Sequence, residues 1–148
     1  MRKRLGILSA LACVLAVFLA AGLYAGTTVP DTIKMKNEKA FEEHRMPIVE
    51  FSHQEHTADD GYGIGCGDCH HDENGEPLTD LEAGDDVQTC FECHSGEGAG
   101  EPKDFMGSPP DEEALNSYYT AVHVNCVACH KKQDGPVACN ECHIKEGE

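Results

Sequence analysis

Eight of the nine cysteines in this chain fall into four copies of one pentapeptide, Cys-x-x-Cys-His. Two thiols at this spacing lie along one porphyrin edge and add to its vinyl groups, while the adjacent histidine ligates the iron from one face. The pattern predicts covalent attachment of four haem c groups. The copies are Cys66-Gly-Asp-Cys69-His70, Cys90-Phe-Glu-Cys93-His94, Cys126-Val-Ala-Cys129-His130 and Cys139-Asn-Glu-Cys142-His143, numbered here as the first to fourth motifs.

Other uses of paired cysteines fit the sequence less well. A lone Cys-x-x-Cys is as often a zinc site or a redox disulfide. Here every pair is followed by histidine, which zinc knuckles and iron–sulfur sites do not require. Haem is therefore favoured over these alternatives.

The remaining histidines match the number of irons. Nine histidines less the four of the motifs leave five, and each of four irons needs one sixth ligand. His53 and His56 precede the first motif, His71 follows it, and His123 shortly precedes the third. The fifth, His44, is expected to be a solvated loop residue. Because no methionine ligand is needed, and a methionine ligand raises the potential, we expect low-potential bis-histidine haems.

The composition agrees with a fold held by cofactors. The 148 residues include only 6% aromatic residues and no tryptophan, and the mean hydropathy is -0.43. Such a chain usually needs disulfides, metals or cofactors in place of a large side-chain core. We therefore expect the haems to take the place of that core.

An export signal is predicted at the N-terminus. Arg2, Lys3 and Arg4 precede an apolar run that ends near Ala25, where cleavage is expected. An uncleaved anchor is the alternative, because the run is long enough to cross a bilayer. Either way the rest of the chain faces an oxidising compartment, the periplasm. The expected division is a signal peptide (1–25), an N-terminal arm (26–46) and a tetrahaem domain (47–148).

The elements that must position these residues are few and short. One helical turn is expected near residues 38–43, and a short strand at residues 48–51 should lead into His53. A helix is predicted from Asp111, which can cap it. Its apolar residues recur at helical spacing: Leu115, Tyr118, Tyr119 and Val122. Four glycines and three prolines predict a surface loop between residues 95 and 110.

The charge excludes some partners. Removal of the signal leaves 8 basic residues against 27 acidic ones, a charge of about -19. This argues against nucleic acid, which needs Lys and Arg clusters, and against anionic lipid. Residues 47–114 hold 19 acidic residues and one lysine. This is either a solvated acidic face or one of two ends that meet different redox partners.

From about Ile48 to His143 the chain resembles the class III cytochromes c, the tetrahaem cytochrome c3 family of sulfate-reducing bacteria. The most specific segments are Phe51-Ser-His53-Gln-Glu-His56 and Cys66-Gly-Asp-Cys69-His70-His71. The resemblance implies distal ligands for the first to fourth haems in the order His53, His71, His56 and His123. It also implies the fold: a small, mostly irregular chain with a few short α-helices and little β-structure, wrapped around four closely packed haems between which electrons hop.

The resemblance implies a periplasmic electron carrier rather than an enzyme, acting between a hydrogenase-linked donor and a membrane redox complex in sulfate respiration. Its partners would be redox proteins: a hydrogenase, another cytochrome c3 or a membrane complex. All four spacings are short, whereas many members have a longer one at the second and fourth haems. Only Lys131, Lys132 and Lys145 lie near the last two motifs, so the chain looks more like the acidic, type II branch.

Two alternatives differ in class. One is a membrane-anchored multihaem quinol dehydrogenase subunit, which would keep the N-terminal helix. The other is a small multihaem reductase of nitrite or hydroxylamine. A reductase needs an open coordination position, and eight imidazoles for eight axial positions leave none.

Overall fold

A computed structural model describes residues 29–96, 103–106 and 109–145. The predicted signal peptide, residues 1–25, and part of the predicted 95–110 loop lie outside the described residues. The chain divides into two units, one of residues 1–29 with 83–86 and the other of residues 30–82 with 87–148. All helices and strands described below belong to the second unit. Within the described ranges, no helix has both the length and the apolar content to span a membrane.

The two strands form one small antiparallel sheet. β1 (Thr32–Lys34) pairs with β2 (Glu50–Ser52), and Ile33 lies opposite Phe51. The strand predicted at residues 48–51 is therefore present, although it begins two residues later and ends one residue later than predicted. The segment predicted to be an N-terminal arm contributes the other strand.

The longest helix is α6 (Tyr118–Lys132), with 15 residues. Ser117 caps its start, because the Ser117 hydroxyl accepts a hydrogen bond from the Thr120 amide at 3.2 Å. A separate helix, α5 (Glu112–Leu115), precedes it and is capped by Asp111 as predicted. The prediction of one continuous helix is wrong, because the Ser117 side chain competes for the backbone and starts a new helix.

The remaining elements are single turns. Three of them begin at the first cysteine of a motif: η1 (Cys66–Asp68), α3 (Cys90–Cys93) and α7 (Cys139–Cys142). The other two are α2 (His53–Thr57), which follows β2 directly, and α4 (Lys103–Met106), which interrupts the predicted 95–110 loop. The turn predicted near residues 38–43 is present as one hydrogen bond, from the Phe41 amide to the Asn37 carbonyl at 3.1 Å.

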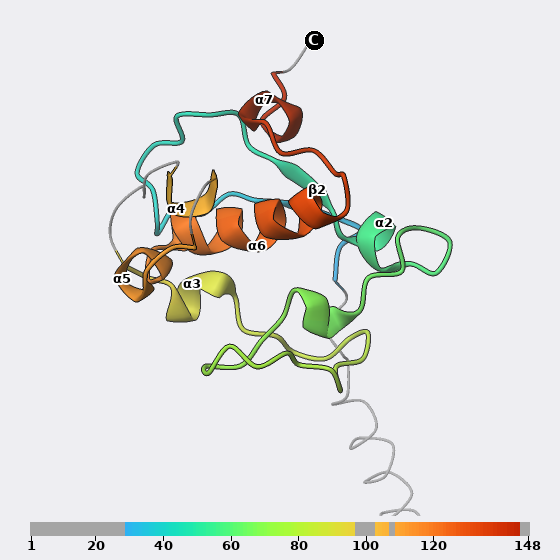
Figure 1. The fold of residues 1–148 in the computed structure, drawn as a ribbon. Coiled ribbons are helices and arrows are strands. Elements are labelled where there is room, and N and C mark those ends of the chain that lie inside the picture. Colours follow the sequence, from blue (N-terminus) through green and yellow to red (C-terminus); the bar gives the residue numbers. More distant parts are fainter. Residues whose placement is uncertain (1–28, 97–102, 107–108, 146–148) are drawn as a thin grey trace, which may run out of the picture. The chain divides into compact units, whose positions relative to one another are not determined.

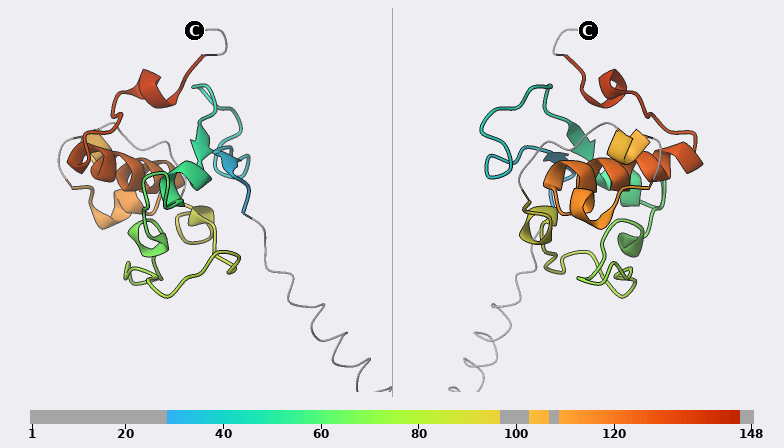
Figure 2. Two further views of the ribbon diagram at one scale, coloured as in Figure 1. Left: turned by 90° about the vertical axis from the view of Figure 1, so that its right-hand side faces the viewer. Right: turned by 60° about the vertical axis from the view of Figure 1, so that its left-hand side comes forward.

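Helix α6 occupies the centre of this unit and packs against α3, α4 and α5 (Figures 1 and 2). Val127, 8% exposed, is the one buried apolar side chain in the described part of the chain. Ser117 and Thr120 are also buried, and their hydroxyls bond each other at 3.0 Å. The fold is the predicted small, mostly irregular chain with short helices and little β-structure. Its side chains alone do not build a core of ordinary size.

Candidate functional site

Three of the four motifs fold into the same turn. In η1, α3 and α7 the motif histidine donates its backbone N–H to the carbonyl of the first cysteine, at 2.8 to 2.9 Å. Residues three apart lie on one face of a helical turn, so the two thiols of each motif stand side by side next to the histidine. The third motif reaches the same spacing inside the last two turns of α6.

In each of these three turns, an acidic side chain accepts a hydrogen bond from the backbone amide of the residue before the first cysteine. Gly65 N–H donates to Asp68 Oδ2 at 3.0 Å, Thr89 N–H to Glu92 Oε2 at 2.9 Å, and Ala138 N–H to Glu141 Oε2 at 2.7 Å. The backbone donors at residues 138 and 137 lower the pKa of Glu141. We call Asp68, Glu92 and Glu141 the turn acids. They stand immediately before the second cysteine, which the sequence shows plainly, but they were not among the predicted site residues.

Six of the eight predicted ligand histidines lie in three close pairs, each of one motif histidine and one other. Ring centres are 5.9 Å apart for His71 and His94, 6.2 Å for His56 and His130, and 6.2 Å for His123 and His143. The remaining two, His53 and His70, are left as the fourth combination of this kind. The pKa of His70 is lowered first by burial and then by the neighbouring His53 and His71.

These separations suit two imidazoles on opposite faces of one iron. Histidine nitrogens bind metals at about 2.0 Å, so two rings in line with one ion have centres roughly 6 Å apart once each ring radius is added. The three measured distances, 5.9 to 6.2 Å, have this size. The residues present therefore fit the bis-histidine haem centres that the sequence predicts.

Backbone carbonyls orient most of these imidazoles. Among the described residues, six ligand histidines have Nδ1 within 2.6 to 2.8 Å of a main-chain carbonyl oxygen. Since a carbonyl only accepts, Nδ1 carries the proton and Nε2 keeps the lone pair that binds iron. The acceptors for His56, His71, His94, His123, His130 and His143 are the carbonyls of Ser52, Asp72, Leu115, Tyr119, Pro136 and Pro47.

Two aromatic rings hold His123 in place. Phe105 of α4 stacks on its imidazole with ring centres 4.6 Å apart, and Tyr119 lies at 4.3 Å. Burial lowers the pKa of His123, so the imidazole stays neutral as a ligand must. Lys131 fixes α4 in turn, donating from Nζ to the Met106 carbonyl at 2.9 Å and to that of Phe105 at 3.4 Å.

The eight cysteine thiols of the motifs are free. Burial raises the pKa of Cys126 to about 11, and it also raises the pKa of Cys69, Cys90 and Cys142. Zinc binding and disulfide exchange both use the thiolate. In the described ranges, no three His, Cys, Asp or Glu side chains converge on a metal site of their own.

His44 differs from the expectation. It was predicted to be solvated, but its Nε2 is buried and makes no hydrogen bond with any described residue. Its ring lies edge-on to Phe41, with centres 5.5 Å apart. The prediction of a solvated side chain is wrong, because the turn after Asn37 folds the Phe41 ring against this imidazole.

Comparison with known proteins gives one family. The family model described as "Class III cytochrome C family" matches residues 30–143, which is more than half of the chain. The match includes all four motifs and the five other histidines. A comparison with curated proteins gives no match.

Proposed function

Because the chain belongs to the class III cytochrome c family, it is a multihaem electron-transfer protein, and we propose that it carries four haem c groups, each with two histidine ligands. The observation that supports this is the set of four histidine pairs, three of them measured at 5.9 to 6.2 Å. The proposed pairs are His53 with His70, His71 with His94, His56 with His130, and His123 with His143. When bound, each haem supplies a one-electron iron couple.

The chain's own residues then set the chemistry. Each motif supplies two thioether links and one ligand, and the second imidazole arrives from another part of the chain. Carbonyl acceptors on Nδ1 keep six imidazoles in one orientation, which limits the rearrangement that electron transfer would otherwise require. With two imidazoles on each iron, no coordination position would be left for a substrate. Electron relay is therefore proposed rather than catalysis, a quinol dehydrogenase or reductase being the alternative.

The proposals for the protein's location and for its partners rest on the sequence rather than on the fold. The proposed site of action is the periplasm, reached through the cleaved signal at residues 1–25. The proposed partners are redox proteins: a hydrogenase-linked donor and a membrane redox complex that serves sulfate respiration. The strong negative charge supports the acidic, type II branch.

The first test is a haem count with the spin state of the oxidised protein. We expect four haems per chain, all low-spin, because every iron has two imidazole ligands. Intact mass gives the count and shows whether the mature chain begins near Gly26, and electron paramagnetic resonance gives the spin state. A high-spin fraction near one haem in four would mean an open iron and would favour the enzyme alternatives.

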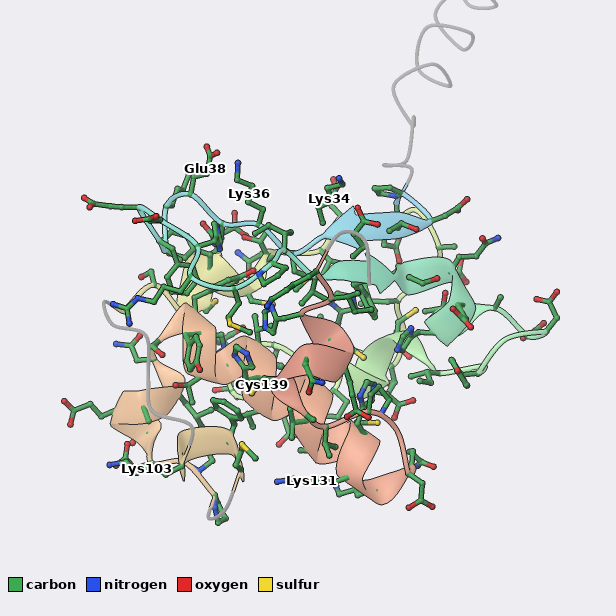
Figure 3. The ribbon with its side chains drawn as sticks, turned by 90° about the horizontal axis from the view of Figure 1, so that it is seen from above. Lys34, Lys36, Glu38, Lys103, Lys131 and Cys139 are labelled. Carbon is green, nitrogen blue, oxygen red and sulfur yellow. The ribbon has the colours of Figure 1, made fainter. Side chains whose placement is uncertain are left out.

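A second test concerns the side on which a donor docks. Lys103 and Lys131 lie at one edge of the unit, opposite Lys34, Lys36 and Glu38 (Figure 3). The Lys131 ammonium is engaged with α4, so its replacement would disturb the His123 environment as well as the charge. Lys132 is exposed and adjoins it, and it is therefore the better probe.

We expect Lys132→Glu to slow reduction by an acidic donor several-fold at low salt, because attraction becomes repulsion at the docking surface. The difference should shrink as salt is added, since exposed charges are screened. Stopped-flow reduction at a series of ionic strengths measures this. Lys39→Glu, the same change next to Glu38, is the matched control. Equal rates for all three proteins at every ionic strength would show that the donor docks elsewhere.

A further inference from the structure

The turn acids form a pattern that haem ligation does not account for. In each of the first, second and fourth motifs the acid accepts a hydrogen bond from the residue before the first cysteine and returns its own N–H to that residue's carbonyl. The return bonds measure 2.9 to 3.0 Å. The residue before the first cysteine has nearly the same extended backbone in all three, with φ from -70° to -83° and ψ from 148° to 153°.

The third motif lacks the acid and does not need it. Its variable residues are Val127 and Ala128, and the motif lies near the end of the 15-residue helix α6. Backbone amides there already bond to the preceding helical turn. The chain thus has three short turns with an acid and one long helix without.

A three- or four-residue turn is not stable by itself, because forming its first hydrogen bonds fixes more residues than those bonds repay. Its leading amides also lack partners inside the turn. An acid three residues after the first of these amides accepts a hydrogen bond from it and fixes the direction in which the chain enters the turn. Without the acid, that amide would hydrogen-bond to water instead, and the two thiols would no longer be held on one face of the turn.

We propose that Asp68, Glu92 and Glu141 are positioning residues that hold three haem-attachment turns closed before the thioether bonds form. At the third motif, the backbone hydrogen bonds of helix α6 hold the two cysteines in the same way. The inference rests on the proposed haem attachment. In that step each cysteine S–H adds across a vinyl C=C: sulfur bonds to one carbon, the proton goes to the other, and nothing is oxidised. The acid matters before this step, since afterwards two covalent links hold the turn.

The test compares Glu141→Ala with Glu141→Gln, and the same pairs at Glu92 and, with Asn, at Asp68. An alanine side chain cannot accept the amide, whereas the amide oxygen of Gln or Asn can. We expect most chains of each alanine variant to lack one haem, and the Gln and Asn variants to keep four. Intact mass counts the haems, and tryptic peptides show which motif is empty. Ala128→Glu, which places an acid in the third motif, is the control and should keep four.

The outcomes separate this inference from the proposed function. A wild-type chain with fewer than four haems contradicts the proposed function. Four haems on the wild type and on all three alanine variants overturn the positioning role alone. Loss in the Gln and Asn variants equal to that in the alanine variants also overturns it, because charge rather than the hydrogen bond would then matter. If an alanine variant is degraded, haem staining against antibody signal in whole cells gives its haem content.

Discussion

The haem-free chain is expected to be largely unfolded. One apolar side chain, Val127, is buried in the described part of the structure. Burying a valine contributes about 1.5–3 kcal/mol, whereas ordering each residue costs about 1–2 kcal/mol of conformational entropy. Apart from α6, the helices have three to five residues and could not persist alone. Four haems would supply the missing apolar contacts, and a cofactor that binds only the folded form stabilises it.

Far-ultraviolet circular dichroism and limited proteolysis of a haem-free preparation measure this. We expect little helical signal and rapid digestion throughout residues 30–143, while the haem-loaded protein, digested in parallel, should resist. A compact and resistant haem-free chain would show that the side chains hold the fold unaided.

Replacing His123 with methionine is expected to raise the potential of one haem on the order of 0.1 V and to leave the others close to their values. A thioether is a poorer donor to ferric iron than an imidazole, so the reduced form gains relative stability. His123 is the residue to change because Phe105, Tyr119 and the Tyr119 carbonyl fix its ring 6.2 Å from that of His143. All four haems should stay attached, since no cysteine is altered.

A spectroscopically resolved redox titration measures the four potentials. His44→Met is the matched control, because it makes the same exchange at the histidine that packs on Phe41. We expect it to leave every potential close to the wild-type value. If the His123→Met titration coincides with that of the wild type, His123 is not a ligand.

Much of the candidate site could be predicted because covalent haem chemistry is local. The spacing within the four motifs was enough to predict eight haem-attaching cysteines and four histidine ligands. The partners His53, His56, His71 and His123 were predicted from their positions and from a family resemblance. The structure places three of them, His56, His71 and His123, at 5.9 to 6.2 Å from motif histidines. The fold class came from the family resemblance, and the scarcity of bulky apolar residues agreed with it because cofactors must then replace a side-chain core.

The rest depends on contacts that spacing does not reveal. The carbonyls that orient the imidazoles are main-chain atoms, present at every residue, and only the folded chain selects the one at Pro47 or Leu115. The break before α6 depended on whether Ser117 would cap or continue a helix. The role of Lys131 also depends on the fold, because its ammonium donates to the Phe105 and Met106 carbonyls of α4. The turn acids can be read in the sequence, but the role proposed for them rests on hydrogen bonds that only the folded chain shows.

The bond from His143 Nδ1 to the Pro47 carbonyl joins residues 96 apart in the sequence. Its pair partner, His123, is oriented by Tyr119, only four residues away. Closing a loop of this length costs about 4 kcal/mol of chain entropy, and contacts of such high sequence separation form late in folding. This hydrogen bond therefore joins the two ends of the predicted tetrahaem domain. It can form only after both ends have been synthesised and have met.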